Sequence, residues 1–385
     1  MRDFVSEVVN SIPPSGIRKF FDIAAEMDDI ITLGVGEPDF STPWHVREEG
    51  IHALEKGFTM YTSNQGLLEL REEIVQKLAV DLSVAYNPKD EILVTVGVSE
   101  GLDLAMRATL SAGDEVLIVE PCYVSYQACA ILCGAIPVSV PTSLQNNFIV
   151  SPDAIAERIT PRTKAILLCY PNNPTGATLA AADLYRVAEL AQKHDLLVFS
   201  DEIYSKLLYE GKHVSIASLE GMKGRTIMLN GFSKSHAMTG WRIGYAAGPA
   251  NLIAAMTKIH QYTMLCAPIA AQKAAIEALR DGDSQMEYMR KKYNQRRRFI
   301  VKGLNDMGLK CAMPQGAFYS FASVEATGLS DSDFAERLLY EARVAVVPGS
   351  VFGESGKGFI RCSYASSIEN INEALKRMEA FIAKL

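Results

Sequence analysis

The feature that most constrains the fold is an alternation of short apolar runs with longer amphipathic stretches through the middle of the chain. Stretches such as 100–110 and 181–193 have helical periodicity. Strands that alternate with helices are typical of βαβ units around a mostly parallel sheet, so this part of the chain is predicted to be α/β. The apolar runs predicted as strands are 92–96, 115–119, 164–169, 196–200, 226–229 and 243–247.

The C-terminal third has a different pattern. A helical region over 267–304 is followed by two short strand candidates, which alternate with two further helices. This order is typical of an α+β unit. We therefore expect a large domain over 46–285 and a smaller α+β domain made of 1–45 and 286–385. The later elements are strands at 317–321 and 359–364, and helices near 332–342 and 368–383.

Composition excludes several classes of protein. The 385 residues are 48% hydrophobic and 22% charged, which is ordinary globular usage. The net charge of -7 gives no general attraction to nucleic acid or to an anionic membrane, so neither partner is expected. The cysteines form no CxxC pair and the histidines no HxxxH pair, so no metal site is predicted. Without a signal peptide or a membrane span, we expect a cytoplasmic protein.

The segment around Lys234 carries the clearest chemical signal. Lys234 follows Ser233, beyond an apolar strand, and Arg242 comes eight residues later. Such a set could seat a carbonyl cofactor with a phosphate arm, in which the lysine bonds to the carbonyl and the arginine binds the phosphate. His236 is expected to be a packing or surface residue, and the arginine run 296–298 is expected to lie on a solvated helix face.

Eight segments, in order along the chain, resemble the motifs of the class I aminotransferases that depend on pyridoxal phosphate and have fold type I. The resemblance covers essentially the whole chain. It implies a large domain with a mostly parallel seven-stranded sheet and a smaller α+β domain. It also implies transfer of an amino group between an L-amino acid and a 2-oxo acid, with pyridoxal 5′-phosphate as cofactor. The segments are Gly36-Glu37-Pro38-Asp39-Phe40, Tyr61, Gly97-Val98-Ser99, Pro121 with Tyr123, Asn172-Asn173-Pro174-Thr175-Gly176, Asp201-Glu202-Ile203-Tyr204, the Lys234 segment and Arg361.

The resemblance implies roles around the coenzyme ring. The family lysine that matches Lys234 carries the coenzyme covalently and then moves the proton of the reaction as base and acid. Asp201 matches the carboxylate that pairs with the pyridine nitrogen and favours the protonated ring. Tyr204 and Asn173 match residues that donate hydrogen bonds to the ring oxygen, and Tyr123 matches the aromatic residue that stacks on the ring. Lys234, Asp201 and Tyr204 are the predicted catalytic residues.

The phosphate of the coenzyme is expected where the strand 92–96 ends and a helix begins. The backbone N–H groups of Val98 and Ser99 would face the anion there, because a helix N-terminus favours negative charge. The side chains of Ser233 and Arg242 would add further donors.

Arg361 is the predicted substrate-binding cation. It lies in the strand candidate 359–364, among apolar or small residues. A guanidinium in such a place is costly unless it meets an anion, and its planar fork fits a carboxylate. The resemblance implies that this anion is the α-carboxylate of the substrate, with Asn173 and the backbone of Gly36 beside it.

Two expectations about geometry come from the resemblance alone. Tyr61 matches a tyrosine that reaches the phosphate of the neighbouring subunit, which implies a homodimer with shared active sites. Relatives hold cis peptide bonds before the prolines that match Pro121 and Pro174, so both bonds are expected to be cis.

The residues leave other functions open. A lyase that acts at Cβ of a sulfur amino acid would use the same lysine, aspartate and arginine. A coenzyme-binding transcription regulator is a different class, but its added DNA-binding domain is not expected in a chain of this length and acidic balance. Some related aspartate enzymes carry a lysine at the place of Ser99, so aromatic or broad neutral substrates are favoured here. Aspartate stays open, as does 2-oxoglutarate as the amino acceptor.

Overall fold

A seven-stranded sheet forms the centre of the larger part of the molecule in the computed structural model, which describes residues 2, 4–14, 16 and 27–385. Neighbouring strands are parallel, except that β8 is antiparallel to both of its neighbours. The predicted α/β class with a mostly parallel seven-stranded sheet is therefore confirmed. In spatial order the strands are β2 (Ile92–Thr95), β8 (Gly244–Ala247), β7 (Thr226–Gly231), β6 (Leu197–Asp201), β5 (Thr163–Cys169), β3 (Glu115–Glu120) and β4 (Ile136–Pro141).

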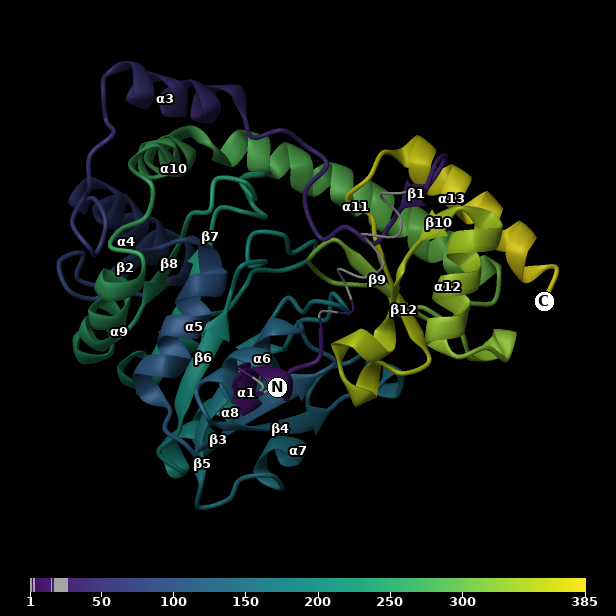
Figure 1. The fold of residues 1–385 in the computed structure, drawn as a ribbon, viewed down its shortest axis with the longest axis horizontal. Coiled ribbons are helices and arrows are strands. Elements are labelled where there is room, and N and C mark those ends of the chain that lie inside the picture. The colour runs from purple at the N-terminus through teal and green to yellow at the C-terminus, as the bar shows by residue number, and fades with distance from the viewer. Residues whose placement is uncertain (1, 3, 15, 17–26) are drawn as a thin grey trace.

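Helices flank this sheet and bury the side chains of its inner strands, so the sequences of these strands are unbroken apolar runs (Figure 1). Successive residues of one strand enter different cores: Leu117 packs in one apolar cluster and Val116 in another. The helices of this part are α3 (Trp44–Glu55), α4 (Leu68–Leu82), α5 (Gly97–Thr109), α6 (Ser125–Leu132), α7 (Pro152–Ala156), α8 (Ala181–Lys193), α9 (Ala250–Thr263) and α10 (Ile269–Asp281).

A three-stranded antiparallel sheet forms the smaller part, in the order β11-β12-β9. A short parallel pair joins β1 to β10, so residues near the N-terminus pair with the C-terminal part. The elements are β1 (Ile31–Thr32), β9 (Tyr319–Ser323), β10 (Val344–Ala345), β11 (Val347–Pro348), β12 (Phe359–Ser363), α11 (Asp283–Asp306), α12 (Asp331–Ala342) and α13 (Ile368–Ile382).

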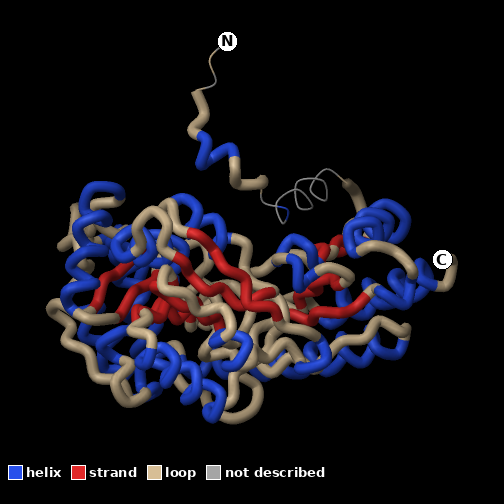
Figure 2. The backbone as a smooth tube through the Cα atoms, turned by 90° about the horizontal axis from the view of Figure 1, so that it is seen from below, coloured by secondary structure: helices blue, strands red, loops and turns tan. Residues whose placement is uncertain are grey.

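Some elements lie outside these two sheets. The short helix α1 (Glu7–Asn10) lies next to α6 at the surface of the main body, and none of its residues is buried (Figure 2). Part of the predicted N-terminal arm, 1–45, lies outside the described residues, and the predicted division into domains stays a prediction. Its boundary at 285 falls in the first turn of α11. The 3₁₀ helices are η1 (Leu144–Asn146), η2 (Ile216–Ser218), η3 (Lys223–Arg225), η4 (Glu325–Thr327), η5 (Gly349–Phe352) and η6 (Glu354–Gly356).

The arginine run 296–298 corrects one expectation. Arg297 is only 2% exposed, and its guanidinium lies 4.7 Å from the centre of the Tyr209 ring. It shares its helix face with the buried Tyr293 and Ile300, because residues three and four apart lie on one side of a helix. The expectation of a solvated face is therefore wrong for Arg297.

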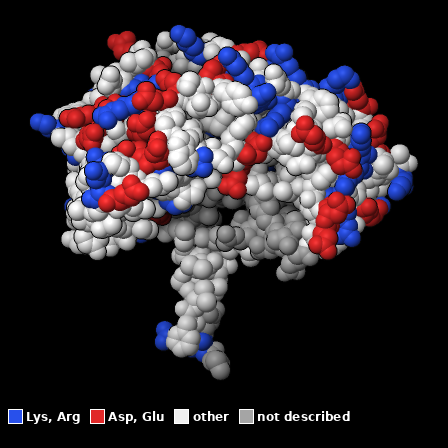
Figure 3. All heavy atoms as spheres, turned by 90° about the horizontal axis from the view of Figure 1, so that it is seen from above, with Lys and Arg blue, Asp and Glu red and all other residues white. Residues whose placement is uncertain are grey.

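The surface shows no segregation of charge on the face drawn in Figure 3, where acidic and basic side chains are interspersed. Within the described part of the chain, no helix is long and apolar enough to span a lipid bilayer.

Candidate active site

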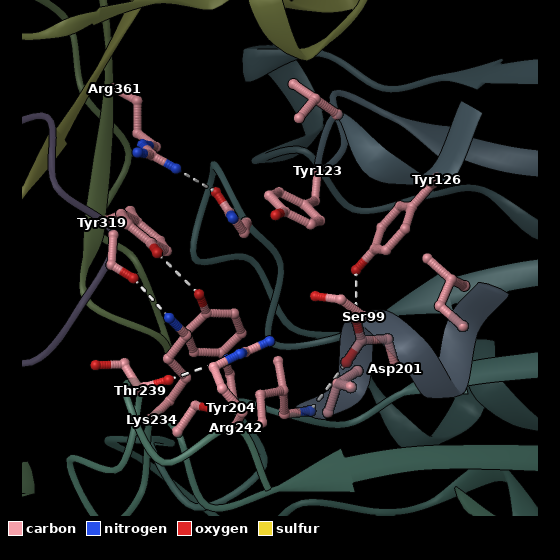
Figure 4. Close-up of a pocket in the computed structure, with 17 residues that line it drawn as sticks. Ser99, Tyr123, Tyr126, Asp201, Tyr204, Lys234, Thr239, Arg242, Tyr319 and Arg361 are labelled. Atoms are coloured by element: carbon pink, nitrogen blue, oxygen red, sulfur yellow. Dashed lines mark hydrogen bonds between the residues drawn. The ribbon is translucent and has the colours of Figure 1, made fainter. Parts of the chain in front are cut away.

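A cavity of about 450 Å³ lies between the two sheets, at the carboxyl ends of strands in the large sheet (Figure 4). Open α/β sheets bind ligands at this edge, because the loops that follow several strands meet there. The cavity brings together every predicted site residue except Tyr61. These residues are Gly36, Val98, Ser99, Tyr123, Asn173, Asp201, Tyr204, Ser233, Lys234, Arg242 and Arg361.

Lys234 follows β7, and its amino group points into the cavity. The Nζ atom donates a hydrogen bond of 2.6 Å to the carbonyl oxygen of Gly36. Burial lowers the pKa of this amine to about 8, although the charge of Glu37 acts in the opposite direction. A lowered pKa increases the neutral fraction near neutral pH, and the neutral amine is the form that attacks a carbonyl carbon.

Asp201 ends β6, and its carboxylate is held in one orientation. The Tyr126 hydroxyl donates to Oδ2 at 2.7 Å, and the Ile203 backbone N–H donates to Oδ1 at 3.2 Å. Burial raises the pKa of Asp201 to about 6, and these two hydrogen bonds offset part of that effect. Across the described ranges, no basic side chain forms an ion pair with Asp201. Its environment therefore suits a cationic ring nitrogen supplied by a ligand.

Side chains that could donate hydrogen bonds to an oxygen on the same ligand ring lie on the side of the cavity opposite Asp201. The hydroxyls of Tyr204 and Tyr319 are 2.8 Å apart, and both side chains are buried. Asn173 accepts a hydrogen bond from Arg361 through Oδ1 at 2.9 Å, which leaves its Nδ2 group as a donor. Tyr123 lines the cavity and packs edge-on against Tyr126, with the ring centres 5.7 Å apart.

The start of α5 forms the anion-binding end of the cavity. Gly97 has a φ of +77°, and a Cβ built there would lie 2.7 Å from Nη2 of Arg242. The guanidinium is thus packed against the helix start, where the N–H groups of Val98 and Ser99 are available. Arg242 also donates to the carbonyl oxygen of Thr239 at 3.0 Å, which orients it. The cationic side chain of Arg242 and the N-terminus of α5 together suit a phosphate group.

Arg361 lies on β12 and is 2% exposed. Its Nη1 binds Asn173, and its Nη2 donates to the carbonyl oxygen of Gly34 at 2.6 Å. The guanidinium lies over the rings of Tyr319 and Phe352, at 4.4 and 4.9 Å from their centres. Its buried Nε has no hydrogen-bond partner, and no acidic side chain in the described ranges pairs with it. A buried cation without a counterion suits an anionic ligand.

Two other predicted residues lie outside this cavity. Tyr61 is 79% exposed and lies beside Leu54 and Met60 on the surface. It therefore does not line the cavity of its own chain. His236 is buried, with Nδ1 2.8 Å from the Ser235 hydroxyl, and burial lowers its pKa to about 4. The histidine is a packing residue, as expected.

The cis peptide bonds follow the expectation and go beyond it. The bonds before Pro121 and Pro174 are both cis. A third cis bond precedes Pro171 and was not predicted.

Sequence reasoning missed two residues that hold the site together, Tyr126 and Tyr319. Tyr126 lies in the first turn of α6, whereas Tyr123 comes before that helix, so helical spacing gives no signal that pairs the two tyrosines. Tyr319 falls in the strand candidate 317–321, where its partner, 115 residues away, leaves no local signal.

Comparison with known proteins identifies the family. The family model "Aminotransferase class I and II" matches residues 28–378. A putative aminotransferase, YugH, of Bacillus subtilis is 52% identical over the full length of both chains. An aspartate aminotransferase of Pyrococcus abyssi is 47% identical over 97% of each. The crystal structure of an aromatic aminotransferase from Pyrococcus horikoshii has a TM-score of 0.91 and 44% identity, covering 96% of this chain and 99% of that one. The chain therefore belongs to the class I and II aminotransferases and is an aminotransferase.

Proposed function

We propose that this aminotransferase binds pyridoxal 5′-phosphate in the cavity and moves an amino group between an L-amino acid and a 2-oxo acid. One observation carries the proposal: Lys234, Asp201, Arg242 and Arg361 meet in one cavity, and none forms an ion pair within the described residues. Asp201 and Arg361 are buried, and buried charges without partners are costly. The coenzyme and the substrate together offer a carbonyl for the amine, a ring nitrogen for the carboxylate, and a phosphate and a carboxylate for the arginines.

When bound, the coenzyme would supply an electron-withdrawing ring. The Nζ atom of Lys234 would take the proton from the substrate Cα as general base and give up a proton later as general acid. Asp201 would pair with the protonated ring nitrogen. Tyr204 and Asn173 would donate hydrogen bonds to the ring oxygen, and Tyr123 would pack against the ring.

Binding is divided between the two arginines. Arg242 holds the phosphate with the Ser233 hydroxyl and the backbone N–H groups of Val98 and Ser99. Arg361 binds the α-carboxylate of the substrate with Asn173, beside the backbone of Gly36. Each group of the ligand thus has its own donor set, which fixes the substrate Cα near the amine of Lys234.

The substrate class is proposed from the charges that remain. Once the amine and the two arginines are used, no further cation lines the described cavity for a distal carboxylate, and Ser99 offers only a hydroxyl. We therefore favour aromatic or broad neutral amino acids as donors, with 2-oxoglutarate as the acceptor. The relatives include both an aspartate and an aromatic enzyme, so aspartate belongs in the same assay.

A homodimer with shared active sites is part of the proposal. Exposed apolar side chains surround Tyr61, among them Leu54 and Met60, each 58% exposed. Apolar surface of this kind marks interfaces, and a second copy would bring its Tyr61 towards the phosphate site. Light scattering should give twice the mass of one chain, and Tyr61→Phe should weaken coenzyme binding.

The cytoplasmic location stays a prediction.

The test of the proposed function is a rate measurement. Steady-state rates with a panel of amino acids and 2-oxoglutarate should be highest for aromatic or neutral donors, and glutamate should form in step with substrate loss. Release of pyruvate and ammonia from a sulfur amino acid, without glutamate formation, would instead indicate a lyase.

A further inference from the structure

We propose that Tyr319 is a positioning residue that couples the carboxylate site to the coenzyme site. Its ring supports Arg361 and its hydroxyl orients Tyr204. The inference rests on the proposed function, in which Arg361 binds the substrate and Tyr204 binds the coenzyme ring. Tyr319 belongs to the smaller sheet, whereas Tyr204 follows a strand of the large sheet, so one side chain connects the two halves of the site.

The contacts of Tyr319 divide into two kinds. The guanidinium of Arg361 lies 4.4 Å from the ring centre, within the range of a cation–π interaction. The hydroxyl lies 2.8 Å from that of Tyr204. Figure 4 shows Tyr319 between these two partners, and the side chain is only 1% exposed. The ring and the hydroxyl therefore serve different halves of the site.

The donor of the hydrogen bond between the two hydroxyls is fixed when the coenzyme ring oxygen accepts a hydrogen bond from Tyr204. A phenol has a single hydrogen to donate. If Tyr204 donates that hydrogen to the ring oxygen, the bond between the phenols must be donated by Tyr319. Burial raises the pKa of both tyrosines, so both keep their hydrogens at neutral pH. Tyr319 thus holds Tyr204 as a donor that faces the cavity.

Gly36 gives independent evidence that the place of this hydroxyl is specified. A Cβ built on Gly36 would lie 2.7 Å from the hydroxyl oxygen of Tyr319, closer than non-bonded atoms approach. The same Cβ would lie 3.7 Å from Nη2 of Arg361. A side chain at residue 36 would therefore displace the hydroxyl, and glycine leaves room for it.

The experiment separates the ring from the hydroxyl by comparing Tyr319→Phe with Tyr319→Leu in the coenzyme-loaded enzyme. Two properties are measured. The first is the apparent pKa of the bound coenzyme, read from the pH dependence of its absorbance and called the absorbance pKa below. The second is the dissociation constant of 3-phenylpropionate, a carboxylate without an amino group. Tyr364→Phe is the matched control. Tyr364 is also buried beside the smaller sheet, but its hydroxyl donates to the Ala317 carbonyl at 3.3 Å, away from the cavity.

Tyr319→Phe should raise the absorbance pKa by roughly 0.5–1 unit, because Tyr204 then stabilises negative charge on the ring oxygen less well. It should leave 3-phenylpropionate binding within about twofold. Tyr319→Leu should also weaken 3-phenylpropionate about tenfold, because Arg361 loses the ring beneath it. Tyr364→Phe should change neither property.

Two outcomes would overturn the inference: an unchanged absorbance pKa in Tyr319→Phe, or equal weakening of 3-phenylpropionate by both Tyr319 variants. If Tyr319→Leu does not fold, the inference is tested by combining Tyr319→Phe with Tyr204→Phe. The pKa shift of the Tyr204→Phe/Tyr319→Phe double variant should equal that of Tyr204→Phe alone, and additive shifts would refute the coupling. If the wild-type enzyme takes up no coenzyme on Lys234, the proposed function itself fails.

Discussion

At the scale of single residues, the two cavity arginines provide a sharp test because their substitutions should fail in different ways. Arg361→Ala should leave coenzyme affinity nearly unchanged. It should lower kcat/KM for all amino acids by roughly two to four orders of magnitude, because a two-pronged charged contact is lost. Arg361→Lys should recover only part, since an ammonium lacks the planar fork.

Arg242→Ala should instead raise the coenzyme concentration needed for activity, and excess coenzyme should restore much of the rate. Titration of both variants with coenzyme and with substrate separates the two effects. The roles are reversed if Arg361→Ala sheds coenzyme while Arg242→Ala keeps it and loses substrate affinity.

Lys234 carries the second residue-scale prediction. Borohydride reduction of the loaded enzyme should fix the coenzyme to Lys234, which mass spectrometry of the peptides would locate. Lys234→Ala should still hold the coenzyme without a covalent bond, because Asp201 and the anion site remain. It should lose turnover, because no other amine lines the described cavity to move the proton. A label on another lysine would contradict the proposed mechanism.

At the scale of elements, the start of α5 links backbone conformation to coenzyme binding. Gly97→Ala should weaken the coenzyme roughly tenfold or more, because the new Cβ pushes Arg242 from the helix start and the positive φ costs about 1–2 kcal/mol. Gly113→Ala is the matched control: its φ is +88°, but nothing lies within 4 Å of its added Cβ. Equilibrium titration should show weaker coenzyme binding for Gly97→Ala only, while both variants lose stability.

The elements also show what could be predicted from sequence and why. Strands buried on both faces gave apolar runs that local pattern detects, and the helix α8 matches its predicted range 181–193. The edge strand β4 was missed because most of its side chains are not buried and it contains Pro137 and Pro141, which are unfavourable in central strands. Motif residues of the site were predicted by resemblance. Tyr319 was not, because its role depends on an approach between distant elements that no local pattern encodes.

At the scale of the whole molecule, the two sheets enclose charges that the chain itself leaves unpaired. Asp201 should therefore make the stability of the coenzyme-free protein depend on pH between pH 4 and 6. Its folded-state pKa of about 6 lies above the ordinary value of 3.8. Between these values the folded protein holds a proton that the unfolded chain has released, so the contribution of Asp201 to the free energy of unfolding falls as pH rises. The buried His236, whose pKa is lowered to about 4, contributes in the opposite direction over the same range, so the effect of Asp201 is read from the difference between the wild type and Asp201→Asn.

Asp201→Asn removes this titration and should stabilise the coenzyme-free protein at pH 7.5 by about 2–3 kcal/mol, with little effect at pH 4. With coenzyme bound the sign should reverse, because the asparagine cannot pair with a protonated ring nitrogen and the variant should bind coenzyme more weakly. Urea unfolding at both pH values, with and without coenzyme, measures all of these changes. Equal effects of the substitution at both pH values in the coenzyme-free protein would show that the charge of Asp201 carries no cost there. The cavity would then owe its affinity for the coenzyme to shape and hydrogen bonds instead of to unpaired charge.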